Sequence, residues 1–264
     1  MNTPRYLLIV LLILTCLYSG CAINKDNIRG FNLISVQEET QLGCRIAVEV
    51  EKQRMIVTDP QVQGYITRLG NQLLRGVRKR EFNFTFKVVR DDSVNAFAIP
   101  GGHIYVNSGL IKFVKTEKEL AAVMAHEINH CVARHGTQKI TQQYGYSLVL
   151  QLLQGRNPSL LTQLASSLFK AGAFLSYSRE MENQADYLAV ETTYRAGYDP
   201  RGMVIFLQKL ELREQSKSGN IGQFFSSHPV TRERIRQVQF EILKLPRKAF
   251  RDDSTGLNRI KSRI

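Results

Sequence analysis

A six-residue stretch, Ala125-His-Glu-Ile-Asn-His130, constrains this chain more than any other. It lies in a run of helix formers from Thr116 to His135 with apolar residues at helical spacing, so we expect a helix there. Residues four apart lie on one face of a helix, which lets His126 and His130 point ring nitrogens at one ion. Two imidazoles in this arrangement suit zinc. Glu127 lies about 100° around the helix and is better placed to take a proton from a metal-bound water than to bind the metal.

A motif this short also arises by chance on ordinary amphipathic helices, so a third ligand is needed to decide between the two interpretations. His135 follows His130 by five residues, about 140° around the helix, and is not expected to reach the same ion. Cys131 is not counted as a ligand because a neighbour in sequence points about 100° away. His103 is better explained as a turn or surface residue. The third ligand must therefore come from another element.

The size and charge of the chain limit its function class. Its 264 residues are 43% hydrophobic, enough for one good core, and carry a formal charge of +13. We expect one catalytic domain over residues 36–245 and a basic, mobile tail over residues 246–264 that can touch an anionic membrane surface. The charge alone would also permit a nucleic-acid or lipid-surface binding protein. No nucleic-acid partner is expected, because no nucleic-acid module is recognisable and Trp is absent.

The N-terminus has the short positive region, apolar run and small-residue site of a secretory signal. The apolar run Tyr6–Leu17 is shorter than the roughly 20 residues that a spanning helix needs. Ser19-Gly-Cys21 resembles a bacterial lipobox, so we expect a lipoprotein signal peptide over residues 1–20, lipidation of Cys21 and a tether over residues 21–35. A plainly secreted or anchored form is the alternative. In a lipoprotein, Ala22 after Cys21 implies sorting to the outer membrane.

Two cysteines, Cys44 and Cys131, remain for the folded domain. In an oxidising periplasm they could form a disulfide that stabilises the fold by a few kcal/mol. Two separately buried thiols are the alternative.

The chain before the motif predicts helices over residues 35–55 and 59–75 and a strand over residues 81–90. Residues 92–109 read as a strand, a Pro-Gly-Gly turn and a second strand. Pro100 disfavours a fully paired central strand, so we expect Asn95–Ile99 at an exposed sheet edge. Such an edge can accept an extended peptide, although a plain hairpin that caps the core is the alternative.

The chain after the motif supplies candidate carboxylates. The apolar pieces over residues 146–153 and 160–175 are expected in the core or in a wall of the cleft, with part against membrane or a partner as the alternative. Ser178 can then cap a helix on which Glu182 and Asp186, four apart, share a face. One carboxylate can bind the ion while the other holds a ligand histidine by its second nitrogen. A solvated acidic face is the alternative.

Four ordered motifs carry a family resemblance; they span residues 95–102, 126–130, 178–186 and 227–235. Together they resemble the HtpX-like and CAAX-prenyl-endopeptidase-like zinc metallopeptidases, most of all a soluble periplasmic lipoprotein branch related to the Oma quality-control proteases. The resemblance implies a mainly α, α+β zincin-like fold of the gluzincin type, with a small antiparallel sheet whose edge strand flanks the active-site helix. The membrane-embedded members have spanning helices around the catalytic region that this chain lacks.

The resemblance also implies roles for individual residues. One Zn²⁺ per chain would be bound by His126, His130 and Glu182, with Glu127 as general base and Asp186 behind a ligand. His228 would face the site as an oxyanion stabiliser or a reversible plug on the metal, with a capping histidine as the alternative, and Arg234 would pair with a nearby carboxylate. Substrate would lie along the edge strand formed by Asn95, Ala96, Phe97 and Ala98.

The expected function is a zinc endopeptidase on the periplasmic side of the bacterial outer membrane. Quality control of misfolded envelope proteins, including outer-membrane proteins, is what the family implies. The alternative is a chaperone or assembly factor for outer-membrane proteins with a plugged or mainly structural zinc site. The oligomeric state is not predicted.

Overall fold

A computed structural model describes residues 30–143, 167, 176–215, 222–251 and 253–264. The predicted signal peptide, the lipidation site Cys21 and most of the tether lie outside the described residues, as do the apolar pieces over residues 146–153 and 160–175, apart from residue 167. The chain divides into the units Met1–Gly30 and Phe31–Ile264, and only the second is described below.

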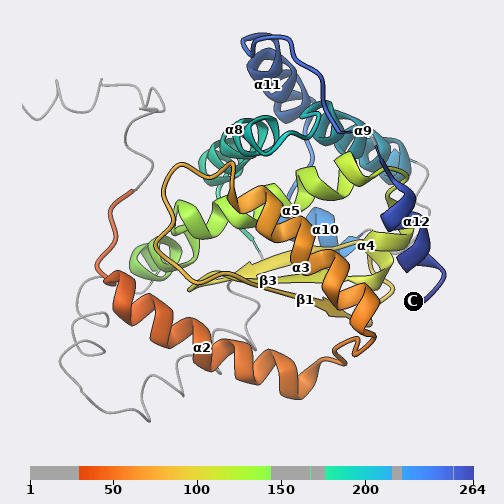
Figure 1. Ribbon diagram of the computed structural model, residues 1–264. Helices are drawn as coiled ribbons and strands as arrows, with labels where there is room; N and C mark the ends of the chain where they lie inside the picture. The colour runs from red at the N-terminus through yellow and green to blue at the C-terminus, as the bar shows by residue number, and fades with distance from the viewer. Residues whose placement is uncertain (1–29, 144–166, 168–175, 216–221, 252) are drawn as a thin grey trace, which may run out of the picture. The chain divides into compact units, whose positions relative to one another are not determined.

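The second unit is mainly helical with one small sheet, which confirms the predicted fold class (Figure 1). Its elements, in chain order, are α2 (Val36–Gln53), α3 (Pro60–Leu74), β1 (Thr85–Val89), β2 (Ala96–Ile99), β3 (His103–Asn107), α4 (Ser108–Phe113), α5 (Glu117–Val132), α8 (Arg179–Ala196), α9 (Arg201–Gln215), α10 (Gly222–Ser227), α11 (Arg232–Leu243) and α12 (Thr255–Lys261). The helices predicted before the motif correspond to α2 and α3. No helix in the described ranges is long and apolar enough to cross a membrane.

The sheet has the strand order β1-β3-β2. β2 and β3 are antiparallel and joined by a turn in which Gly101 and Gly102 have φ values of 82° and 92°, conformations that glycine adopts without strain. β1, however, runs parallel to β3, so the prediction of a purely antiparallel sheet was wrong. The apolar alternation over residues 81–90 and the Pro-Gly-Gly turn identified the strands, but neither carries information on the direction in which β1 pairs with β3. The predicted edge position of β2 is confirmed, but the edge is not exposed as expected, because Asn95–Ile99 are at most 6% exposed.

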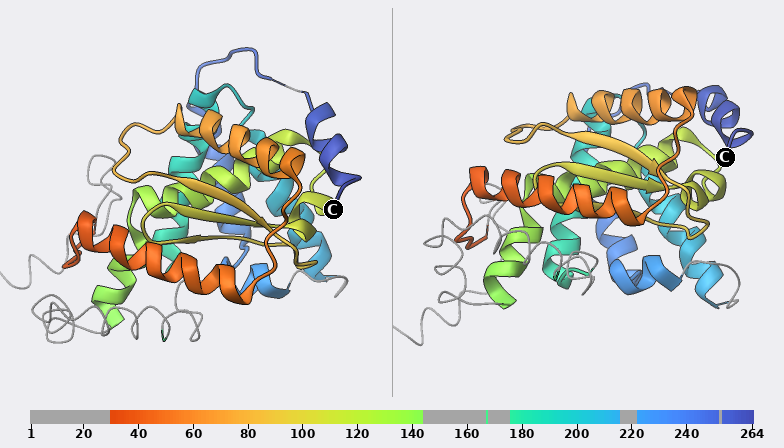
Figure 2. Two further views of the ribbon diagram at one scale, coloured as in Figure 1. Left: turned by 60° about the horizontal axis from the view of Figure 1, so that its bottom comes forward. Right: turned by 90° about the horizontal axis from the view of Figure 1, so that it is seen from below.

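Side chains of the strands alternate between two clusters on opposite faces of the sheet. Ala96 and Ala98 of β2 join the larger cluster with α3, α5, α8 and α9, whereas Phe97 packs in the smaller one with α2. Phe97 stacks on Tyr105 with ring centroids 5.1 Å apart. Figure 2 shows α2, coloured orange-red, along one face of the sheet. Helix α5 lies at the centre of the larger cluster, where it packs against β2, β3, α3, α8 and α9.

The C-terminal segment 246–264 differs from the expected mobile tail. It contains α12, which packs against α3 and α4, and the side chains of Leu257 and Ile260 are 0% and 2% exposed. Arg263 adds an ion pair to Asp59, with 2.8 Å between Nε and Oδ2. Leu257 and Ile260 are three apart, the spacing of one face of a short helix. The many basic residues of this segment obscured that signal in the sequence.

The two cysteines are separate, so the possible disulfide was wrong, and the alternative of two buried thiols holds only for Cys131. Both are free thiols; Cys44 is exposed on α2 and Cys131 is buried on α5. The Cys131 thiol donates a hydrogen bond to the carbonyl of Ile99 on β2, at 3.4 Å. Cys131 therefore helps to hold the edge strand against α5.

Candidate metal centre

Helix α5 presents its two motif histidines to each other inside the core. The helix begins with a capping box between Thr116 and Glu119. Its residues from Glu119 to Cys131 are all buried. His126 and His130 are 3% and 1% exposed, and their Nε2 atoms are 2.9 Å apart. The four-residue spacing thus brings two electron-pair donors to one point, as the sequence indicated.

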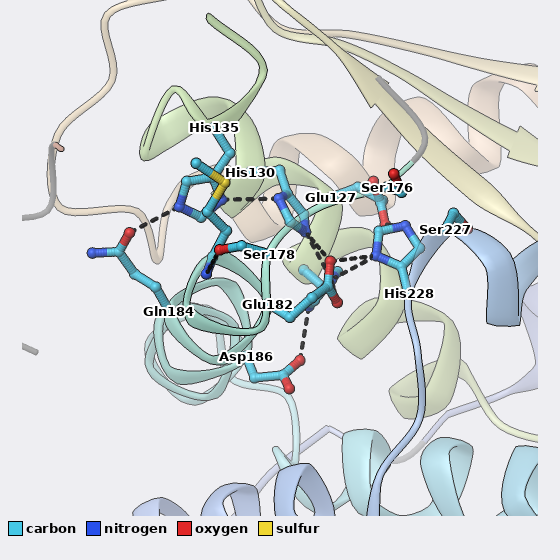
Figure 3. A network of polar contacts seen from close by, with 12 residues as sticks. Glu127, His130, His135, Ser176, Ser178, Glu182, Gln184, Asp186, Ser227 and His228 are labelled. Atoms are coloured by element: carbon cyan, nitrogen blue, oxygen red, sulfur yellow. Dashed lines mark hydrogen bonds and ion pairs between the residues drawn. The ribbon is translucent and has the colours of Figure 1, made fainter. Parts of the chain in front are cut away.

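Helix α8 adds a carboxylate to the same point (Figure 3). Ser178 caps this helix by accepting a hydrogen bond from the backbone N–H of Met181 at 3.3 Å. One turn in, Glu182 is 2% exposed, with Oε1 3.4 Å from His130 Nε2 and Oε2 3.4 Å from His126 Nε2. The alternative of a solvated acidic face is wrong, because Glu182 and Asp186 are both buried.

A third histidine, His228, completes the cluster from the C-terminal side. It directly follows α10, where its backbone N–H donates to the carbonyl of Phe224 at 2.7 Å. His228 Nδ1 lies 2.9 Å from Glu182 Oε1 and 3.3 Å from His126 Nε2. Among the described residues, His126, His130, Glu182 and His228 form a group whose ligand atoms all lie within 4.8 Å of one another.

The donor set and its spacing fit a zinc ion. A tetrahedral site with bonds of about 2.0–2.2 Å places its ligand atoms roughly 3.3–3.6 Å apart. The separations among the two Nε2 atoms and the Glu182 oxygens, 2.9, 3.4 and 3.4 Å, are close to that range. Burial opposes protonation of His126, but Glu182 and Asp186 outweigh it and raise the His126 pKa to about 10. The site therefore attracts positive charge, which a divalent cation would supply in place of a proton.

Asp186 and Arg234 support the cluster from behind. Asp186 Oδ1 lies 2.8 Å from His126 Nδ1, the nitrogen that faces away from the ligand cluster. The Arg234 guanidinium donates to both Asp186 oxygens, at 2.7 and 2.9 Å, and its Nη1 lies 2.9 Å from Glu182 Oε2. Burial raises the pKa of Asp186, but Arg234 and His126 more than reverse this, so its pKa is lowered and the carboxylate stays ionised. A second carboxylate behind a ligand histidine fixes the ring and leaves Nε2 free to bind.

Glu127 lies beside the cluster without joining it. Its side chain is fully buried, and neither oxygen accepts a hydrogen bond of normal length from the described residues. Burial raises the pKa of Glu127, against opposing effects of His228 and His126. Oε1 lies 3.4 Å from His228 Nε2, so the two side chains face the same space (Figure 3).

The predicted substrate strand packs against the motif helix. Asn95, Ala96, Phe97 and Ala98 are all buried, with exposures of 0%, 0%, 6% and 3%. The carbonyl of Asn95 accepts a hydrogen bond from the Asn107 backbone at 3.0 Å, but the Asn95 side-chain amide has no partner in the described part of the chain. His103 opens β3 and contacts Thr85 Oγ1 at 2.8 Å, away from the cluster, as predicted.

Two residues at the centre were not anticipated. The ring of Tyr177 stacks on His130, with centroids 4.0 Å apart. His135 is fully buried and its Nδ1 lies 2.9 Å from His130 Nδ1. Tyr177 carries no signal in the sequence. The prediction for His135 assumed a continuous helix, which gave no reason to expect this ring behind His130.

Comparisons with known proteins place the chain in a family. The model of peptidase family M48 matches residues 60–242, which include the motif helix, α8, and the His228 and Arg234 segment. The mitochondrial metalloendopeptidase OMA1 of Schizosaccharomyces pombe is 31% identical over 217 residues, covering 81% of this chain and 64% of the relative. The beta-barrel assembly-enhancing protease of Escherichia coli is 28% identical over 217 residues, covering 78% of this chain and 44% of the relative.

These matches confirm the expected relation to Oma-type zinc metallopeptidases, although the chain spans less than two thirds of the length of either relative. The family model covers most of the chain, and the cluster has the donor atoms that zinc prefers. Both observations favour a metallopeptidase over the alternative that the histidine motif arose by chance. The chain therefore belongs to peptidase family M48.

Proposed function

We propose that this chain is a zinc-dependent endopeptidase that holds one Zn²⁺ between His126, His130 and Glu182. The observation that carries the proposal is the convergence of these side chains, at 2.9–3.4 Å, from two helices with Glu127 beside them. Two imidazoles and one carboxylate leave the fourth position of a tetrahedral zinc open, which is the ligand set of hydrolytic zinc sites.

A zinc ion bound here would lower the pKa of a water and polarise a peptide carbonyl. Glu127 acts as the general base: it takes a proton from the attacking water and passes it to the leaving amine. The raised pKa of Glu127 suits both steps, because a carboxyl group that is too acidic returns a proton poorly. Asp186 and Arg234 hold His126 and Glu182 in position during the cycle.

The substrate peptide lies along β2 as an added strand, with Asn95, Ala96, Phe97 and Ala98 as its contact residues. The edge position of β2 and its packing against α5 support this placement. The unpartnered amide of Asn95 supports it as well, because a buried amide that lacks a partner is costly unless a ligand satisfies it.

His228 acts as a reversible plug. Its Nδ1 lies 3.3 Å from His126 Nε2 and 2.9 Å from Glu182 Oε1, so His228 would compete with water for a zinc ion held by these residues. Catalysis then requires His228 to withdraw. The alternative role, an oxyanion stabiliser, would leave His228 in the site as a hydrogen-bond donor.

We place the enzyme on the periplasmic side of the bacterial outer membrane, anchored by lipid on Cys21, where it degrades misfolded or misassembled envelope proteins. The lipobox-like Ser19-Gly-Cys21 supports the anchor. The name of the Escherichia coli relative, a beta-barrel assembly-enhancing protease, supports substrates of the outer-membrane class, because single-chain outer-membrane proteins are β-barrels.

A chaperone or assembly factor for outer-membrane proteins is the second candidate. The position of His228 favours it, because a cluster that already has four protein groups resembles a closed site. Under this alternative the zinc is mainly structural and cleavage is secondary.

The test compares wild type with Glu127→Gln for zinc content and for digestion of casein and a misfolded outer-membrane protein. Glu127→Gln should retain one zinc per chain and lose activity by about 10²–10⁴-fold, the usual contribution of a general base. Glu233→Gln, an exposed change on α11, is the matched control and should keep full activity. Full activity of Glu127→Gln would remove Glu127 from the mechanism. Rescue of envelope function by Glu127→Gln would favour the chaperone.

A further inference from the structure

His135 contacts a ligand histidine from behind, although it lies outside the group of four ligand residues. Its ring is 0% exposed and bridges two elements of the centre (Figure 3). On one side, Nδ1 lies 2.9 Å from Nδ1 of His130 on α5. On the other, Nε2 lies 2.8 Å from Oε1 of Gln184 on α8, two residues beyond Glu182.

We propose that His135 and Gln184 form a positioning pair that fixes the tautomer of His130 and so presents its Nε2 lone pair to the metal. The inference rests on the proposed function, because it assigns a role toward the zinc ligand His130. Neither member of the pair touches the metal or the substrate; both act through His130.

The proton positions follow from the contacts. A glutamine side-chain oxygen can only accept a hydrogen bond, so His135 Nε2 donates to Gln184. A neutral imidazole carries a single N–H, and the contact with Gln184 places it on Nε2 of His135. His135 Nδ1 is then an acceptor, and it takes the hydrogen bond from His130 Nδ1–H. The Nε2 of His130 is left without a proton, which is the form that binds zinc.

A break in the chain brings His135 to this position. On a continuous helix His135 would point about 140° away from His130. Helix α5 instead ends at Val132, Arg134 has a φ of 62°, and helical conformation resumes over residues 135–143. The turn thus returns the His135 ring to the side of α5 that carries His130.

The buried side chain of Arg134 holds this turn. Arg134 Nε donates to Glu39 Oε2 on α2 at 2.6 Å, and its Nη2 donates to the carbonyl of Ile34. Thr137 Oγ1 donates to the same Glu39 oxygen at 2.7 Å. A left-handed conformation is unfavourable for a residue with a Cβ, so the surrounding contacts must enforce it. The contacts to α2 therefore keep His135 behind His130.

The two ligand histidines are supported in different ways. His126 faces the charged carboxylate of Asp186, whereas His130 faces the neutral imidazole of His135. The His135 arrangement needs a hydrogen-bond acceptor at position 184, which fixes the His135 proton on Nε2. A variant that keeps the acceptor can therefore be compared with one that only fills the space.

The experiment measures zinc affinity by competition with a chromophoric chelator in wild type, Gln184→Leu and Gln184→Glu. Loss of a group that orients a ligand usually weakens metal binding by about 10–100-fold, which is the loss expected for Gln184→Leu. Gln184→Glu keeps an acceptor for His135 Nε2 and should retain the wild-type affinity. Asn183→Leu, the same change one residue earlier on α8, is the matched control and should also bind normally.

A spectroscopic readout complements the affinities. Histidine side-chain ¹⁵N spectra of the zinc-loaded protein should show His135 protonated at Nε2 and His130 protonated at Nδ1. Normal affinity in Gln184→Leu, weak binding in Gln184→Glu, or a His135 ring protonated at Nδ1 would each overturn the positioning pair. These results leave the proposed function intact if wild type binds zinc and cleaves peptides, whereas a wild type that binds no zinc overturns both.

Discussion

Arg234 and Asp186 form a two-armed ion pair behind His126, with nitrogen–oxygen distances of 2.7 and 2.9 Å. A third nitrogen of the same guanidinium lies 2.9 Å from Glu182. All three residues are at most 4% exposed, so one cation neutralises two acids that water cannot reach. Helix α11, which supplies no ligand, is therefore part of the candidate metal centre.

Removal of Arg234 should destabilise the fold. Arg234→Leu leaves Asp186 and Glu182 buried without a cation, and the expected decrease in the free energy of unfolding is about 3–5 kcal/mol. Arg234→Lys keeps the charge but loses the planar fork, so its loss should be smaller. Denaturant unfolding of the zinc-free proteins measures both. Arg232→Leu is the control: its pair with Glu211 is exposed, so the change should stay within about 1 kcal/mol. Equal losses for Arg232→Leu and Arg234→Leu would contradict the argument.

Glu182→Gln should abolish the stabilisation of the fold by zinc. The amide preserves the shape of the side chain but removes the anionic donor, so the zinc content should fall from one per chain toward zero. In wild type, zinc at 100 times its Kd should add about 2.7 kcal/mol to the free energy of unfolding, and chelation should remove it. Thermal unfolding with and without a chelator measures this difference. An equal chelator effect in Glu182→Gln and wild type would rule out Glu182 as a ligand.

His228→Ala distinguishes the two roles proposed for that histidine. If His228 is a plug, only the molecules in which it has withdrawn are active. Its removal should then raise the peptidase activity by the reciprocal of that fraction of molecules. If His228 instead donates to the oxyanion, activity falls by about 10²–10³-fold. Initial rates on a short peptide at saturating zinc decide between them. The geometry of Nδ1, which points into the ligand cluster, leads us to expect the increase.

Leu257→Ala tests whether the C-terminal segment belongs to the core. Leu257 is fully buried under α3 and α4, so its truncation should cost about 2–5 kcal/mol of unfolding free energy. Asn258→Ala, at the neighbouring exposed position on α12, is the control. A mobile tail would make the two variants equally stable.

The sequence predicted what depends on local spacing. The caps and apolar periods identified α5 and α8, and the two pairs of residues four apart, His126 with His130 and Glu182 with Asp186, indicated the centre. The parallel pairing of β1 with β3 escaped prediction because strand order depends on distant contacts. The role of His135 escaped because an arginine, not a glycine, adopts the left-handed turn before it.

The inward orientation of β2 has a consequence for selectivity. Ala96 and Ala98 point into one cluster and Phe97 into the other, so a peptide that paired with the free side of β2 would meet backbone groups and few side chains. A polypeptide laid along this edge would be chosen for being extended and unpaired, whatever its residues. A folded protein, whose strands already have partners, would offer no free strand to pair with this edge, whereas an unfolded segment would.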